Sequence, residues 1–108
     1  MELHELSLQE THEQLSSRKV SSAELTRAYL ERIQRLDPQV KSYVTVSEDV
    51  ALEQAKKADE RIKSGEGLTP LMGIPYCAKD SLSPRGVNTT CSSKILENYK
   101  PFYDSTAI

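Results

Sequence analysis

The chain has 108 residues, of which 28% are charged and 37% hydrophobic, and its formal net charge at pH 7 is −2. Its 14 basic residues are outnumbered by 16 acidic ones, which argues against direct binding of nucleic acid, because that function needs a surplus of clustered basic side chains. No apolar run approaches the ~20 residues that span a bilayer and the acidic start lacks the basic and apolar regions of a signal peptide, so we expect a cytoplasmic protein without a membrane segment.

Aromatic residues make up only 6% of the chain and tryptophan is absent, which is little for a self-sufficient α/β fold and suits a segment whose core is completed by further chain. Cys77 and Cys91 form no Cys-x-x-Cys pair, and we interpret them as free thiols of a reducing compartment. His4 and His12 lie far from both cysteines, and the four residues lack the ligand spacing of a zinc site. We therefore predict no metal site and no cofactor in this chain.

Two helices are predicted in the first third of the chain. Leucines spaced among polar residues predict a short helix at about 7–17. Residues 21–24 form a capping box ahead of a longer helix at 22–36, on which apolar side chains recur at helical spacing. We expect this helix to end at Asp37, because Pro38 disfavours helical geometry in the residue before it.

A strand, a third helix and a second strand follow. The β-branched residues at 40–46 predict a strand. Ser47 can cap a helix at 48–64, and Gly65 stands where a left-handed C-cap is wanted. The glycines on either side of Glu66 do not form a phosphate loop, because no helix carrying the required lysine begins there. The compact apolar run 74–79 predicts a buried strand.

The last quarter of the chain predicts mostly loop. Pro84 and Gly86 mark a turn within 81–86. A short helix is expected at about 92–98, and Asp104 is placed to cap the first turn of another helix. The fold class that follows from these elements is α/β, with a mixed sheet covered by helices that is incomplete in this chain.

Lys79 is the candidate catalytic residue. At the end of an apolar strand it would lie in the crevice at strand ends where active sites of open α/β sheets form. The alternative is that the lysine has no catalytic role and only marks the point where the strand becomes exposed to solvent. Acting as a proton acceptor would require a neutral amine, and burial disfavours the charged form. Asp80 would oppose this if it touched the amine, but alternation along the strand directs Asp80 away, toward backbone donors of the next loop.

The sequence Ser92-Ser93-Lys94 superficially suggests a serine–lysine dyad. We discount it, because adjacent helical residues do not face one another and no glycine-rich stretch surrounds them to supply an oxyanion hole. We expect these residues to cap a helix and to face solvent.

Residues 71–80, with the sequence LMGIPYCAKD, resemble the segment of the amidase-signature family that carries its catalytic lysine. Residues 86–99 and 103–107 are similar, more specifically, to the A subunits of the aspartyl/glutamyl-tRNA amidotransferases. The helices predicted upstream fit the same family at 20–25 and 55–62. The resemblance therefore covers almost the whole chain.

The resemblance implies a mixed sheet wrapped by helices, and a triad of a nucleophilic serine, a bridging serine in a cis peptide and a lysine, of which only the lysine maps here, onto Lys79. It implies a subunit that hydrolyses glutamine and passes ammonia to the B subunit, where glutamate or aspartate on mischarged tRNA is amidated. Subunits B and C are the implied partners, and the ATP and Mg²⁺ of the complex are used by the partner subunit. Residues 1–108 would be the amino-terminal portion of a single amidase domain, truncated before the nucleophile region and inactive alone.

The chain departs from the family in two ways. The glycine- and serine-rich core that would carry both serines is absent, and Tyr76 and Ala78 stand where the family more often has aliphatic residues. Two alternatives stay open from the sequence: part of another amidase-signature amide hydrolase, or a short non-catalytic binding module whose uncovered apolar face docks on a partner.

Overall fold

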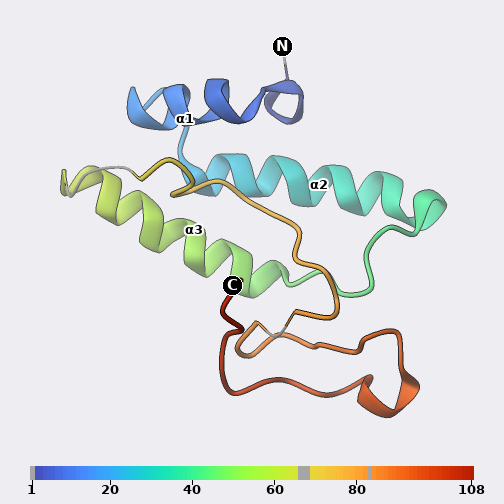
Figure 1. Ribbon diagram of the computed structural model, residues 1–108. Helices are drawn as coiled ribbons and strands as arrows, with labels where there is room; N and C mark the ends of the chain where they lie inside the picture. The colour runs from blue at the N-terminus through green and yellow to red at the C-terminus, as the bar shows by residue number, and fades with distance from the viewer. Residues whose placement is uncertain (1, 66–68, 83) are drawn as a thin grey trace. The chain divides into compact units, whose positions relative to one another are not determined.

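The computed structural model describes residues 2–65, 69–82 and 84–108. It contains a 3₁₀ turn η1 (Leu3–Glu5), helices α1 (Leu8–Ser16), α2 (Ser22–Val40) and α3 (Glu48–Lys63), and a second 3₁₀ turn η2 (Lys94–Leu96) (Figure 1). The chain divides into two compact units. Unit 1 combines the residues up to Ser42 with Glu48–Pro75, and unit 2 combines Tyr43–Ser47 with Tyr76–Ile108.

The start of α2 is fixed by side chains from different parts of unit 1. Ser21 is the N-cap, and its hydroxyl accepts a hydrogen bond from the Glu24 backbone N–H at 3.1 Å, which is the Ser21 half of the predicted capping box. The carboxylate of Asp59, on α3, accepts from the backbone N–H groups of Ser22 at 2.6 Å and Ala23 at 3.0 Å. These bonds satisfy N–H groups that have no partner within the helix, and they tie α3 to the start of α2.

The predicted end of the second helix is wrong, because α2 continues past Pro38 to Val40. Proline near a C-terminus removes one backbone donor but leaves the earlier turns intact. The C-cap is Lys41, whose N–H still donates to the Asp37 carbonyl at 2.6 Å and whose left-handed backbone (φ 56°) then turns the chain out of the helix. The Asp37 carboxylate then accepts from the Ser42 N–H at 2.7 Å. Asp37 is therefore not the last residue of the helix, but binds the backbone N–H groups that follow its C-terminus.

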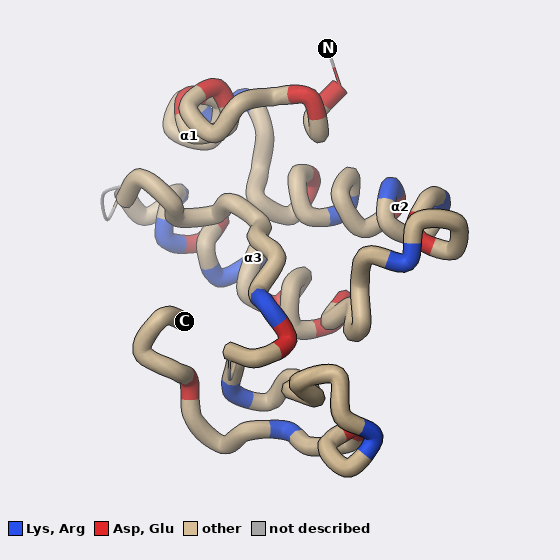
Figure 2. The backbone as a smooth tube through the Cα atoms, turned by 45° about the vertical axis from the view of Figure 1, so that its right-hand side comes forward, with Lys and Arg blue, Asp and Glu red and all other residues tan. Residues whose placement is uncertain are grey.

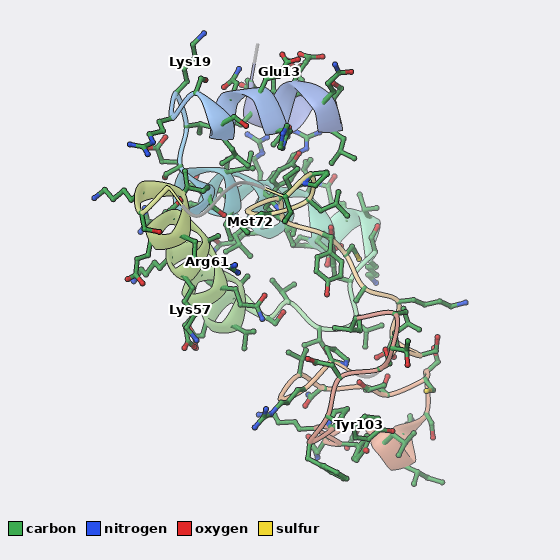
Figure 3. All side chains as sticks on the ribbon, turned by 60° about the vertical axis from the view of Figure 1, so that its left-hand side comes forward. Glu13, Lys19, Lys57, Arg61, Met72 and Tyr103 are labelled. Atoms are coloured by element: carbon green, nitrogen blue, oxygen red, sulfur yellow. The ribbon has the colours of Figure 1, made fainter. Side chains whose placement is uncertain are left out.

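Helix α3 lies beside α2 in unit 1 (Figure 1). Ala55 of α3 is buried, and its small side chain allows the two helices to pack closely. Lys57 and Arg61 follow one another on exposed turns of α3 (Figure 3). Gly65 follows the helix with a φ of +76°, which is the left-handed C-cap that the sequence predicts.

Unit 1 has a small hydrophobic core. Leu15 of α1, Val20 of the following turn and Leu25 of α2 form a buried cluster. Leu3, Tyr29 and Ile74 pack against this cluster. Basic and acidic residues are interspersed along α2 and α3 (Figure 2).

The two predicted strands are wrong for this chain: within the described ranges, no residue of 40–46 or 74–79 is in a strand. Val40 belongs to α2, and Val44 and Tyr76 are 66% and 69% exposed. Strand propensity reflects the fit of a side chain to a half-buried pleated surface, and such a surface needs neighbouring strands. Because the described residues provide none, these segments run as irregular chain.

Unit 2 consists of loops around one short helical turn. Only η2 forms within the predicted helix at 92–98. The carboxylate of Asp104 accepts from the backbone N–H of Arg85 at 2.7 Å, so Asp104 binds a loop across the unit. The helix that we expected it to cap is only a turn, closed by the Ile108 N–H and the Ser105 carbonyl at 3.0 Å.

Neither the helices of unit 1 nor the short turn of unit 2 combines the length and apolar character needed to cross a bilayer, within the residues that the structure describes.

Candidate functional site

Lys79 lies in unit 2 on irregular chain, and its side chain is exposed. The expected burial of this amine is therefore not found in this chain. The backbone around it is nevertheless ordered by hydrogen bonds, since the Lys79 carbonyl accepts from the Leu82 N–H at 3.0 Å. The structure thus presents the lysine on a turn, where its side chain is open to solvent.

Asp80, the next residue, is the acceptor at the centre of unit 2. One carboxylate oxygen, Oδ1, accepts from the Thr90 backbone N–H at 2.9 Å. The other, Oδ2, accepts from the Thr90 hydroxyl and from the Ser92 N–H, the latter at 3.3 Å. The Asp80 backbone carbonyl accepts in addition from the Cys91 N–H at 3.2 Å. Asp80 therefore binds the backbone donors of the following loop, as the sequence predicts, although without the predicted strand.

The loop that supplies these donors has an unusual backbone. Cys91 and Ser92 have φ values of 49° and 60°, and left-handed geometry is uncommon for residues other than glycine. In this turn the N–H groups of Thr90 and Ser92 donate to the two Asp80 carboxylate oxygens, and the Cys91 N–H donates to the Asp80 carbonyl. Thr89 and Thr90 are 3% and 7% exposed, so the hydrogen bonds from Thr90 to Asp80 are partly buried, whereas the one from the Ser92 N–H is exposed to solvent.

These contacts stabilise the ionised form of the Asp80 carboxyl. The hydrogen bond from the Thr90 hydroxyl, followed by those from the backbone N–H groups of Thr90 and Ser92, holds the pKa of Asp80 below its ordinary value of 3.8, against an opposing effect of partial burial. Asp80 is thus a carboxylate at neutral pH. Within the described part of the chain it forms no ion pair with Lys79.

The Ser92-Ser93-Lys94 sequence does not form a dyad. The Ser93 hydroxyl accepts from the Ile95 N–H at 3.3 Å and is the N-cap of η2, while Ser92 and Lys94 are exposed. This agrees with the prediction that the segment caps a helical turn and faces solvent.

Cys77 and Cys91 are both free and exposed. Among the residues with described positions, no three His, Cys, Asp or Glu side chains lie close enough to hold a metal ion. The acidic group nearest to Lys79 along the chain is Asp80, whose oxygens are already engaged.

Thr90 is a residue of this network that the sequence does not single out. Thr90 donates to Asp80 through both its side chain and its backbone. No periodic pattern marks this pairing. The sequence indicates only that Asp80, if it is not to pair with the Lys79 amine, needs hydrogen-bond donors from another part of the chain.

Comparison with known proteins identifies relatives of this site. The sequence model of the amidase family matches residues 24–108, a range that includes Lys79 and the whole hydrogen-bonded loop.

Individual relatives share about half of the sequence. The chain is 53% identical over 108 residues to the A subunit of the glutamyl-tRNA(Gln) amidotransferase of Geobacter sulfurreducens, and 50% identical over 108 residues to that of Thermoanaerobacter pseudethanolicus. It is 48% identical over 107 residues to that of Dehalococcoides mccartyi. These alignments cover 99–100% of this chain but 22% of each relative, so the chain spans about a fifth of the relatives' length.

Proposed function

The chain belongs to the amidase family, and from this premise we propose that it forms the amino-terminal part of a glutamine-hydrolysing amidotransferase subunit. The observation that carries the proposal is the identity of about 50% with the A subunits of amidotransferases, which extends over the whole chain. In the complete domain, the helices of this chain would cover an α/β core with a mixed sheet, formed for the most part by other residues of the domain.

Lys79 is the proton carrier in the proposed reaction. Through a bridging serine it accepts the proton of a nucleophilic serine, and that serine oxygen attacks the carboxamide carbon of glutamine. The carbon–nitrogen bond then breaks, and the proton returns from Lys79 to the leaving ammonia. Water hydrolyses the resulting ester and releases glutamate. Both serines and the donors that stabilise the oxyanion are contributed by other residues of the domain.

The proposed role also defines the partners, which are the amidotransferase subunits B and C. Ammonia released by the subunit to which this chain belongs would be used by the B subunit to amidate glutamate or aspartate on mischarged tRNA in the cytoplasm, and the C subunit would be the third member of the complex. ATP and Mg²⁺ are assigned to the partner subunit, and no cofactor is assigned to this chain.

Residues 1–108 alone are expected to be inactive. The isolated chain lacks the nucleophile and the oxyanion donors, and losing a single oxyanion donor costs about 100- to 1,000-fold in kcat. Ammonia release from glutamine by the purified chain should therefore not exceed the buffer background. If the purified chain hydrolysed glutamine and Lys79→Met abolished that activity, the serines and oxyanion donors could not lie outside residues 1–108, and the proposal would be contradicted.

A graft tests the function directly. Residues 1–108 replace the matching segment of the A subunit of Geobacter sulfurreducens, which is produced with its partner subunits. The graft should hydrolyse glutamine, Lys79→Met should lower kcat by at least about 100-fold, and the matched control Lys94→Met should stay close to the unaltered graft. A folded graft without glutaminase activity, or one that tolerates Lys79→Met, would overturn the proposal.

A further inference from the structure

The segment bearing Lys79 is held through the residue that follows it. Within unit 2, the Asp80 carboxylate accepts three hydrogen bonds and its carbonyl a fourth, all from residues 90–92. The Lys79 carbonyl is bound separately, by the Leu82 N–H. Both peptide groups that follow the Lys79 Cα are therefore fixed, although the side chain itself is exposed.

The donors of this network are held in place at a conformational cost. The two consecutive left-handed residues, Cys91 and Ser92, each adopt a backbone that is unfavourable for a residue other than glycine. The Ser92 N–H also lies 3.3 Å from the Thr90 hydroxyl oxygen. Such a backbone persists where surrounding contacts over-determine it, and the contacts present here converge on Asp80.

Asp80 is unsuited to act directly on a substrate. Its Oδ1 accepts from one donor and its Oδ2 from two, so the carboxylate oxygens are engaged in holding the loop. Pairing with Lys79 would instead favour the charged form of the amine, which is the wrong form for a proton acceptor. The same hydrogen bonds that fix the loop thus keep the carboxylate away from the lysine.

We propose that Asp80 is a positioning residue for Lys79: by binding Thr90 and Ser92 it fixes the backbone from which the lysine amine reaches the catalytic serines. This rests on the function proposed above and adds a residue to it. Proton transfer requires hydrogen-bond reach, and a displacement of about 1 Å costs roughly 100-fold in rate. Binding of glutamine should be unaffected, because the Asp80 carboxylate oxygens are already engaged by Thr90 and Ser92.

The test uses the graft described above. Asp80→Ala should lower kcat for glutamine hydrolysis by about 10- to 100-fold while KM for glutamine stays within about twofold. Thr90→Val keeps the backbone donor but loses the hydroxyl, and it should lower kcat less than Asp80→Ala does. Thr90→Ser keeps the hydroxyl and should lower kcat less than Thr90→Val does. A loss of kcat that follows this order assigns the effect to the hydrogen bonds.

The matched control is Asp104→Ala. Asp104 also binds a backbone N–H of unit 2, that of Arg85 at 2.7 Å, but it does not adjoin the lysine. Both aspartate variants should lower the melting temperature of the graft, whereas only Asp80→Ala should lower kcat by tenfold or more. Equal losses of kcat in the two variants, or an increase in KM that accounts for the Asp80→Ala effect, would overturn the positioning role.

The outcome for Asp80 is separable from that for the function. If Lys79→Met abolishes hydrolysis and Asp80→Ala leaves kcat within twofold of the unaltered graft, the positioning role is refuted while the function stands. If Lys79→Met has no effect, the proposed function itself is refuted.

Discussion

Unit 1 and unit 2 are stabilised by different means. The interior of unit 1 contains large apolar side chains, with Leu15 and Leu25 almost completely buried. Unit 2 contains no buried large aliphatic or aromatic side chain among its described residues. Its buried residues are Thr89, Thr90 and Pro101. Unit 1 therefore has an apolar core, whereas the loops of unit 2 are joined by hydrogen bonds, both to the carboxylates of Asp80 and Asp104 and between backbone groups.

Most of the exposed large apolar side chains belong to unit 2, whereas the buried ones belong to unit 1. Eleven large hydrophobic residues of the described chain are exposed, and eight of these belong to unit 2. Ile95 is 94% exposed and Phe102 82%. The rings of Phe102 and Tyr103 are arranged edge to face, with their centroids 5.2 Å apart (Tyr103 is labelled in Figure 3). The contrast shows that the unit carrying Lys79 is the one with the least core of its own.

The largest expected effect concerns the core of unit 1. Leu25→Ala should lower the free energy of unfolding of the chain by about 2–5 kcal/mol, because it leaves a cavity among Leu15, Val20 and Tyr29. Ile95→Ala removes a similar aliphatic side chain from unit 2 and should change this free energy by less than about 0.5 kcal/mol. Urea unfolding followed by far-UV circular dichroism measures both, and similar losses would remove the distinction between the two units.

A smaller effect is expected where α3 caps α2. Asp59→Ala removes the acceptor for the N–H groups of Ser22 and Ala23 and should lower the free energy of unfolding by about 1 kcal/mol. Glu60→Ala, at the exposed neighbouring position, is the control and should leave it nearly unchanged. If Glu60→Ala lowers the free energy of unfolding as much as Asp59→Ala does, the loss of stability is not caused by the capping contact.

The smallest effect is the pH response of unit 2. Because the pKa of Asp80 is lowered below 3.8 in the folded state, its contribution to stability is present above that value and is lost as the pH falls through the folded-state pKa. The amide resonances of Thr90 and Ser92 should therefore shift together with a midpoint below pH 3.8, and Asp80→Asn should abolish that transition. A midpoint at or above 3.8 would show that the hydrogen bonds do not favour the carboxylate.

The helices of unit 1 were predictable because their signals are local. Apolar residues recur at helical spacing, Ser21 caps α2 and Gly65 supplies a left-handed turn, and each of these appears in the structure. The end of α2 was misplaced by about one turn, since the rule about the residue before a proline gives no weight to the Asp37 and Lys41 contacts that close the helix.

Unit 2 was predictable only in part, for a physical reason. The hydrogen bonds that join its loops connect residues ten or more positions apart, such as Asp80 with Thr90 and Arg85 with Asp104, and no periodicity encodes such pairs. The strand predicted at 74–79 depended on neighbouring strands that the described residues do not include. Lys79 was singled out by its place at the end of an apolar run and by family resemblance, and its catalytic role stays a prediction.

The most direct test of the central claim is the activity of Lys79→Arg in the graft. Arginine keeps the positive charge and much of the length of lysine, but it is not deprotonated in proteins and therefore cannot accept a proton. If Lys79 carries the proton, the arginine variant should hydrolyse glutamine as poorly as Lys79→Met, at least about 100-fold below the unaltered graft. Glutaminase activity within a few fold of the unaltered graft would contradict a proton carrier at position 79.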